Sequence, residues 1–368
     1  MEQQRRPGFT LAAFAVGFAA VVVILGAWTR LEDAGLGCPD WPGCYGFLGV
    51  PQAAEDIAEA ERLYPDAPFE ADKAWPEMIH RYFAGSLGLL ILGIVALALK
   101  NRGPGQPLKL PLTLLGMVML QGAFGAWTVT LKLWPQVVTA HLLGGFTTLT
   151  LLWLLALRLG WRWLPAPVAF QGAAQALRPW ALALLVAVVA QIALGGWVSS
   201  NYAALACPDF PTCQGSWVPE ADFAHGFDFA QEVGPNYLGG ALYGEGRVAI
   251  HFVHRLGALV VAALGVWMIL RLLRAPEMLG LRRWGQALGA VLALQISLGI
   301  GNVVLGLPLV VATAHNAVGA ALLLVTVAVN YRLHTATRAS ASCAKVPWPA
   351  RPWPCPGVIT TRCASPGW

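Results

Sequence analysis

The chain has 368 residues, of which 57% are hydrophobic and only 12% are charged, with a formal net charge of +5 at pH 7. This composition is too apolar for a soluble globular protein and predicts an integral membrane protein. The small positive charge does not predict a nucleic-acid partner, because the basic residues form no patch interleaved with exposed aromatic residues.

Eight apolar segments follow one another along the chain, and each is close to the roughly 20 residues that a helix needs to cross a bilayer. They cover residues 9–29, 77–99, 110–131, 136–157, 179–199, 249–272, 285–305 and 309–331. The predicted fold class is therefore an all-α integral membrane protein with eight transmembrane helices.

The distribution of lysine and arginine predicts the orientation of these helices. The two long loops, 30–76 and 200–248, are acidic or neutral, whereas the opposite helix ends are rich in basic residues. Because basic loops are retained in the cytoplasm, we expect both termini there and both long loops outside. The basic ends carry Arg5, Arg6, Lys100, Arg102, Lys109, Arg158, Arg162, Arg178, Arg271, Arg274, Arg282, Arg283, Arg332 and Arg338.

The second half of the chain repeats motifs of the first half in the same order. A His-Arg motif and a Thr-Ala-His motif occur once in each half, inside apolar segments and at the same separation. The matching segments are EMIHRYFAG (77–85) with HFVHRLGAL (251–259), and VVTAHLLGG (137–145) with VATAHNAVG (311–319). This duplication predicts two four-helix bundles of the same topology, related as parallel repeats.

The duplication also predicts how the chain is divided. We expect a cytoplasmic N-terminus, a first four-helix repeat, a cytoplasmic linker, a second four-helix repeat and a proline-rich cytoplasmic tail that is disordered. These parts cover residues 1–8, 9–157, 158–178, 179–331 and 332–368, respectively.

Two pairs of cysteines occupy matching positions in the two long loops. Cys38 and Cys44 enclose the sequence CPDWPGC, and Cys207 and Cys213 enclose CPDFPTC. Outside the cytoplasm, cysteines this close tend to form disulfides. A redox-active disulfide and a structural staple on a tight turn both fit this pattern, and the staple is the favoured interpretation.

Four histidines, His80, His141, His254 and His315, lie a few residues inside the expected outer ends of their helices, roughly 5–10 Å below the interface. Ionisable side chains are costly in a membrane and usually mark a functional site. Neutral imidazole is a good axial ligand for haem iron, and two facing histidines can hold one haem between them. An interhelical hydrogen bond would explain a single histidine, but four in a duplicated pattern favour haem binding.

Charged residues accompany two of these histidines. Arg81 and Arg255 directly follow His80 and His254, and each is a candidate to pair with a haem propionate. A guanidinium group near the interface would compensate a carboxylate that otherwise has no partner.

Glu77 distinguishes the first half from the second, which has His251 at the matching position. Glu77 precedes His80 by three residues, so its carboxylate is expected to face the same space and to stabilise positive charge or transfer a proton. The alternative is an acid stabilised by the dipole at a helix N-terminus. The asymmetry favours a functional role and predicts that one half holds a permanent cofactor while the reaction takes place in the other.

Together these motifs resemble the haem A synthase family. The resemblance covers roughly residues 10–332. The two cysteine pairs make the chain similar to the bacterial members of the family that carry such pairs. It rests on GLGCPDWPGC (35–44), EMIHR (77–81), TAHLLGG (139–145), ACPDFPTC (206–213), HFVHR (251–255) and TAHNAVG (313–319).

The resemblance implies an enzyme that oxidises a ring methyl of haem O to a formyl group, which gives haem A for cytochrome oxidase. It implies that His254 and His315 hold the iron of a resident haem b. It further implies that His80 and His141 bind the iron of the substrate haem O, and that Glu77 takes part in catalysis. Of the disulfide pairs, Cys38–Cys44 would be functionally important and Cys207–Cys213 structural.

The resemblance also implies a multi-pass protein of the bacterial plasma (inner) membrane, in contact with lipid and supplied with haem O by haem O synthase. An electron donor, cytochrome oxidase assembly factors and a second copy of the chain are candidate partners. Two other functions fit the same histidines. A bis-histidine diheme b-type electron carrier would have no need of Glu77, and a transporter with a histidine-lined path would contain no haem.

Overall fold

The computed structural model describes residues 6–103, 105–160, 168–275 and 280–344. Within these ranges, eight helices are long and apolar enough to cross a membrane, which confirms the predicted all-α membrane fold. They are α1 (Phe9–Leu31), α3 (Ala71–Lys100), α4 (Lys109–Thr130), α5 (Pro135–Gly160), α6 (Val168–Ser200), α8 (Gly244–Leu273), α9 (Arg282–Val304) and α10 (Leu309–Ala344).

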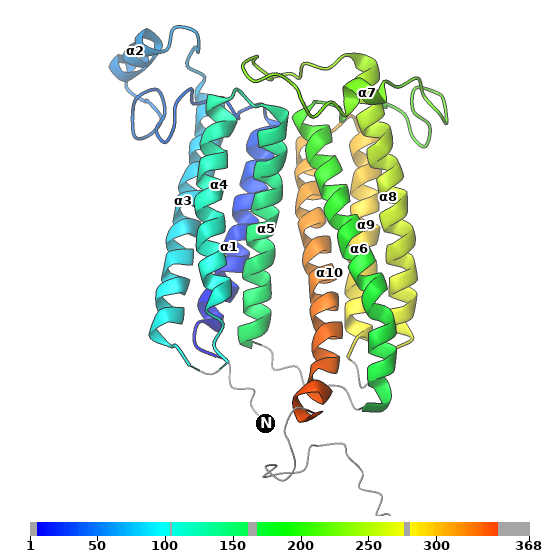
Figure 1. Cartoon of the computed structure of the whole chain (residues 1–368). Helices are drawn as coiled ribbons and strands as arrows, with labels where there is room; N and C mark the ends of the chain where they lie inside the picture. Colours follow the sequence, from blue (N-terminus) through cyan, green and yellow to red (C-terminus); the bar gives the residue numbers. More distant parts are fainter. Residues whose placement is uncertain (1–5, 104, 161–167, 276–279, 345–368) are drawn as a thin grey trace, which may run out of the picture.

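The eight long helices pack as two neighbouring groups of four (Figure 1). In the first group, α3 and α5 each pack against α1 and α4. In the second group, α8 and α10 each pack against α6 and α9. The groups meet where α5 contacts α6 and α10 and where α1 contacts α10. The relation of the two groups as parallel repeats stays a prediction.

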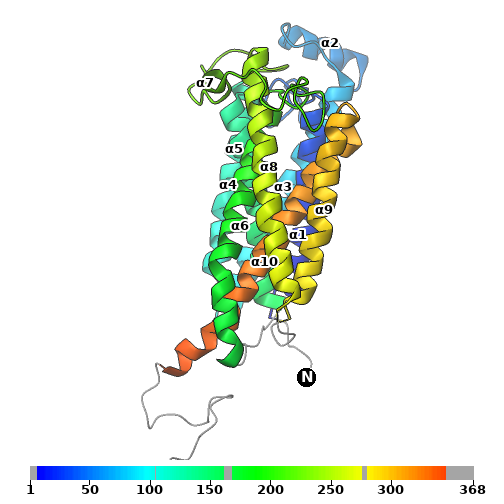
Figure 2. The ribbon, with the colours of Figure 1, turned by 90° about the vertical axis from the view of Figure 1, so that its right-hand side faces the viewer.

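Both long connections, residues 32–70 and 201–243, lie at the same end of the helices (Figures 1 and 2), which we call the loop end. They contain the short helices α2 (Ala54–Leu63) and α7 (Phe223–Gly226), which the sequence analysis did not predict. The described N-terminal residues and the end of α10 lie at the opposite end.

Side chains along the spans divide into a packed interior and an exposed belt. Ala12 and Ala15 of α1 are fully buried, and small residues of this kind let helices approach closely. By contrast, large apolar side chains such as Leu89 and Leu259 are exposed in the middle of their helices. Such a surface is stable when it faces lipid, because lipid is as apolar as the side chains themselves.

Two helices extend beyond the predicted spans. α6 begins at Val168, inside the predicted linker 158–178, and α10 continues to Ala344, so the start of the predicted disordered tail is helical. Both extensions are rich in alanine, which favours helix outside the membrane as well as inside it. The rest of these predicted segments, 161–167 and 345–368, lies outside the described residues.

Candidate functional site

The structure brings His80 of α3 and His141 of α5 together near the loop end of the first helix group. Their ring centroids are 6.4 Å apart and their ring planes are nearly perpendicular, at 88°. Two metal–imidazole bonds of about 2 Å each, together with the two ring radii, span a distance of this size. The two rings would therefore be able to hold one haem iron between them.

His254 of α8 and His315 of α10 occupy the corresponding positions in the second group. In each group the two histidine-bearing helices lie diagonally, with the other two helices between them. All four histidines remain partly accessible to solvent although they lie within membrane spans. The Nδ1 atoms of His80, His141 and His315 are buried without a hydrogen-bond partner, which leaves polar capacity for a bound group.

Each histidine ring packs against a glycine on a neighbouring helix, a feature that the sequence analysis missed. A methyl group on any of these glycines would approach the Cε1 atom of the imidazole. The distances from an ideal Cβ would be 2.8 Å for Gly26 and His80, 3.5 Å for Gly125 and His141, 3.2 Å for Gly195 and His254, and 3.1 Å for Gly299 and His315. The glycines therefore make room for the rings. The matching LGAW (25–28) and LGGW (194–197) segments were a signal of this pattern.

Two of these glycines give a matched test of that space. Gly26→Ala is expected to displace His80, because a Cβ at 2.8 Å is closer than a normal contact. Gly125→Ala is expected to be tolerated, since 3.5 Å from His141 is ordinary van der Waals contact. The absorbance of low-spin haem in the purified variants measures the difference. Equal haem content in the two variants would contradict this account of the rings.

Both predicted cysteine pairs are disulfides in the structure. The Cα atoms are 4.8 Å apart in Cys38–Cys44 and 4.6 Å apart in Cys207–Cys213. All four cysteines are buried, and each disulfide closes a loop that lies above the first turns of a histidine-bearing helix. The two loops thus occupy corresponding places in the two helix groups.

An aspartate shapes the turn in each disulfide loop. The carboxylate of Asp209 accepts hydrogen bonds from the backbone N–H groups of Gln214, at 2.5 Å, and Gly215, at 3.0 Å. The Thr212 hydroxyl, followed by these backbone groups, lowers the pKa of Asp209 below its ordinary value. Asp40 accepts the corresponding pair of backbone bonds in the first loop. In the second loop, the ionised form of Asp209 is therefore the one that holds the turn.

The two arginines that follow the histidines bind these loops. Arg81 donates to the backbone carbonyl oxygen of Asp40, at 3.0 Å, and to that of Gly43. Arg255 binds in the same way to the carbonyl oxygens of Cys207 (2.9 Å), Asp209 (2.8 Å) and Thr212 (2.7 Å). The Nε atom of Arg255 is buried and has no partner, so it still has a donor to offer to an anionic group. Pairing of either arginine with a propionate stays a prediction.

Glu77 is buried, with 5% of its surface exposed, and both of its carboxylate oxygens are engaged. One oxygen accepts from the backbone N–H of Cys38 at 2.9 Å, and the other forms an ion pair with Arg81 at 2.6 Å. The three-residue spacing predicts that this carboxylate faces the same space as His80. In the structure it binds the disulfide loop, because Arg81 and the loop backbone supply the donors that a buried carboxylate requires.

His251 occupies the matching position in the second group and makes the opposite kind of bond. Its Nδ1 is 3.0 Å from the backbone carbonyl oxygen of Ala203, to which an imidazole N–H donates. The first loop is therefore held by a charged acceptor and the second by a neutral donor. The two loops are thus anchored in chemically different ways. The different roles of the two halves, which the asymmetry of the sequence suggested, stay a prediction.

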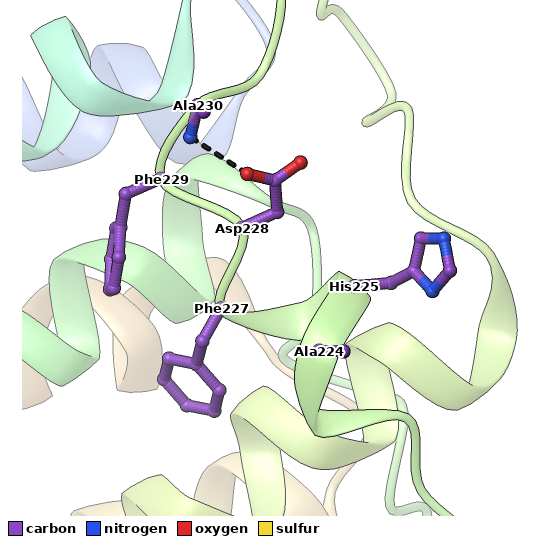
Figure 3. A pocket seen from close by; sticks show the side chains of 6 residues that line it. All are labelled: Ala224, His225, Phe227, Asp228, Phe229 and Ala230. Atoms are coloured by element: carbon purple, nitrogen blue, oxygen red, sulfur yellow. Dashed lines mark hydrogen bonds between the residues drawn. The ribbon is translucent and has the colours of Figure 1, made fainter.

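A shallow pocket of about 600 Å³ lies apart from the four histidines, in the connection between α6 and α8. Its polar groups are engaged locally, since Asp228 accepts from the Ala230 N–H at 2.8 Å and His225 pairs with Asp222 at 2.6 Å. The pocket is open to solvent and lined by Ala224, His225, Phe227, Asp228, Phe229 and Ala230 (Figure 3). It offers no counterpart to the paired histidines.

The fold and these sites define a multi-pass helical membrane protein with a pair of histidines near the loop end of each of two helix groups. Residues 9–327 match the COX15-CtaA family, which is described as cytochrome oxidase assembly protein. The chain belongs to this family.

Curated relatives share most of their length with this chain. The haem A synthase of Shewanella oneidensis is 48% identical over 316 residues, which cover 86% of this chain and 93% of the relative. The haem A synthase of Chelativorans sp. (strain BNC1) is 32% identical, with 80% of this chain and 82% of the relative covered. The haem A synthase of Sphingopyxis alaskensis is 31% identical, with 89% and 93% covered. The family that the motifs resembled is thereby confirmed.

Proposed function

We propose that this protein is a haem A synthase, which oxidises a ring methyl of haem O to the formyl group of haem A. The family match and the 48% identity to a haem A synthase support the assignment. The observation that carries it is the pair of facing histidines, 6.4 Å apart, in a membrane-embedded helix group. The reaction removes two hydrogens from the methyl carbon and adds one oxygen. It is a four-electron oxidation and so requires an electron acceptor.

Within this proposal the two helix groups have different roles. His254 and His315 hold the iron of a resident haem b, and His80 and His141 hold the iron of the substrate haem O. Haem iron supplies one-electron redox chemistry when it is bound. The chemical difference between the two groups, an acid at position 77 against an imidazole at 251, supports placing the reaction in the first.

Glu77 is the proposed catalytic carboxylate of the first group. Its carboxylate lies one helical turn from His80 and carries a negative charge that Arg81 balances. There it stabilises positive charge that develops on the substrate ring, or accepts a proton at Oε1 or Oε2. The same ion pair holds the Cys38–Cys44 loop over the site, which keeps water away from the substrate.

The proposed setting is the inner membrane of a bacterium, with both termini in the cytoplasm and the loop end outside. The concentration of basic residues at the opposite end supports this orientation. Haem O would come from a haem O synthase, and haem A would pass to cytochrome oxidase during assembly. An electron donor, assembly factors and a second copy of the chain are the remaining proposed partners.

Analysis of the bound pigments tests the proposed function. The purified full chain is extracted, and its haems are separated by chromatography and identified by mass spectrometry. Haem b together with haem O, haem A or a hydroxylated intermediate is the expected result. Haem b alone would instead indicate the diheme electron carrier. A colourless protein, made by cells with ample iron and porphyrin, would contradict both the synthase and the electron carrier. The transporter would then be the remaining function.

A further inference from the structure

Glutamine side chains contact both histidines of the second helix group. Gln191 of α6 donates through Nε2 to the backbone oxygen of His254 at 2.9 Å, and the same atom lies 3.1 Å from the ring Nδ1. Gln295 of α9 places its Nε2 atom 3.3 Å from the ring Nε2 of His315. Each glutamine lies four residues before the glycine that makes room for the ring, so one helix face supplies both contacts.

The first helix group has only one such glutamine. Gln121 of α4 donates to the backbone oxygen of His141 at 2.9 Å. On α1 the corresponding position is Val22, which cannot form a side-chain hydrogen bond. Within the described residues, the ring of His80 has a polar contact with the backbone of Val22 and none with a side-chain amide.

The space around the missing glutamine differs as well. In the second group, a Cβ at Gly257 would overlap with the side-chain oxygen of Gln191, so this glycine makes room for the amide. The matching position in the first group is Phe83, which stacks on Phe18 with ring centroids 5.4 Å apart. The pair Val22 and Phe83 therefore replaces the pair Gln191 and Gly257, and an apolar contact takes the place of a polar one.

The glutamines also have unused hydrogen-bonding capacity. The Oε1 atoms of Gln121, Gln191 and Gln295 are all buried without a partner. A histidine that binds a metal through one ring nitrogen almost always donates its other ring N–H to an acceptor, which fixes the ring and strengthens the ligand. The rings of His254 and His315 each lie within hydrogen-bond distance of a glutamine amide on a neighbouring helix, and Gln121 contacts the backbone of His141. His80 has only the backbone of Val22 at the corresponding place.

We propose that Gln121, Gln191 and Gln295 are positioning residues that hold three histidines in the orientation for ligating iron. His80, which has the backbone of Val22 in place of a glutamine amide, is the weakly held ligand that gives way when the substrate haem enters or leaves. The inference rests on the proposed function, because it assumes a haem in each group. It assigns the permanent cofactor to the group with two glutamines and the exchangeable one to the group with a single glutamine.

Carbon monoxide tests which ligand gives way, since it binds ferrous haem only where an axial position opens. The purified full chain, with both haems bound, is reduced with dithionite and exposed to carbon monoxide. We expect about half of the total haem to react, which is the share held by the first group. Gln191→Val and Gln295→Val are each expected to raise the reactive fraction above the wild-type value. The midpoint potential of haem b should rise with it, because the histidine becomes a weaker donor.

The reciprocal variant introduces the missing amide. Val22→Gln with Phe83→Gly copies the arrangement of the second group, and it should lower the reactive fraction at least about threefold. Gln136→Val is the matched control. Gln136 also donates to a backbone oxygen, that of Phe229, and also has a buried Oε1 without a partner, but it contacts no histidine. This control should leave the reactive fraction unchanged.

The outcomes separate the inference from the function on which it depends. Wild-type protein that contains no haem would contradict the proposed function itself. Wild-type protein that contains both haems but binds no carbon monoxide would overturn the inference alone. The inference would also be overturned if the Val22→Gln, Phe83→Gly protein bound carbon monoxide to the same extent as the wild type. If that double variant does not fold, an unchanged fraction in both Gln191→Val and Gln295→Val would overturn the inference.

Discussion

Replacing His315 by alanine is expected to remove haem b from the purified protein and to abolish haem A formation. The ring packs on Gly299 and is contacted by Gln295. Alanine removes the imidazole, and neither of these neighbours supplies a replacement ligand for the iron. The haem b content should fall at least about tenfold, since even changes around a metal ligand cost that much. Extraction of the haem and assay of haem A in the membranes measure both effects.

Two controls separate the loss of a ligand from the loss of the fold. Imidazole added to His315→Ala protein should restore low-spin haem absorbance, which a merely misfolded protein would not regain. His225→Ala should retain normal haem content, because that side chain is 68% exposed and pairs with Asp222 in the connection between α6 and α8. Normal haem b content in His315→Ala would contradict the proposed cofactor site.

Replacing Glu77 by alanine is expected to stop haem A formation while haem b remains bound in the second group. The change removes the acceptor for the Cys38 N–H and leaves Arg81 as a buried charge without its ion-pair partner. Breaking a buried ion pair in this way costs about 3 to 5 kcal/mol. The disulfide loop should therefore loosen, and faster hydrogen exchange over residues 32–50 would report it.

Two further variants provide the comparison and the control for Glu77→Ala. Glu77→Gln keeps an acceptor for the Cys38 N–H but not the negative charge, so it should retain more loop protection than Glu77→Ala and still lack activity. Glu59→Ala is the control, because Glu59 forms an exposed pair with Arg62 on α2. Unchanged haem A formation in Glu77→Ala would refute the catalytic role of Glu77. A diheme protein that forms no haem A, and whose electron transfer Glu77→Ala leaves intact, would favour the electron carrier.

Several features of the fold followed from local sequence. The predicted span 9–29 corresponds to α1 (Phe9–Leu31), and the span 110–131 corresponds to α4 (Lys109–Thr130). Agreement this close arises because a helix in lipid must satisfy its backbone polar groups internally and must match the thickness of the bilayer. Pairing of cysteines six residues apart was equally local, and both predicted disulfides are present.

The contacts of the charged side chains could not be predicted in the same way. Helical periodicity showed that Glu77 and His80 share a face, but not that the backbone of Cys38 would fold over the carboxylate. The pattern likewise placed Arg81 beside His80 without revealing the loop carbonyl groups that it binds. These partners are backbone atoms of a loop distant in sequence, and their positions are set by the folded loop and not by residue type.

The sequence by itself determined eight spans, a duplicated set of four histidines and a single acid that breaks the duplication. These depend on apolar length and residue identity, which a bilayer selects locally. Only the tertiary structure decided that His80 and His141 face each other across a bundle and that Val22 lies where the other three histidines have a glutamine. Those relations depend on the rotation and tilt of each helix, and packing against the neighbouring helices sets both.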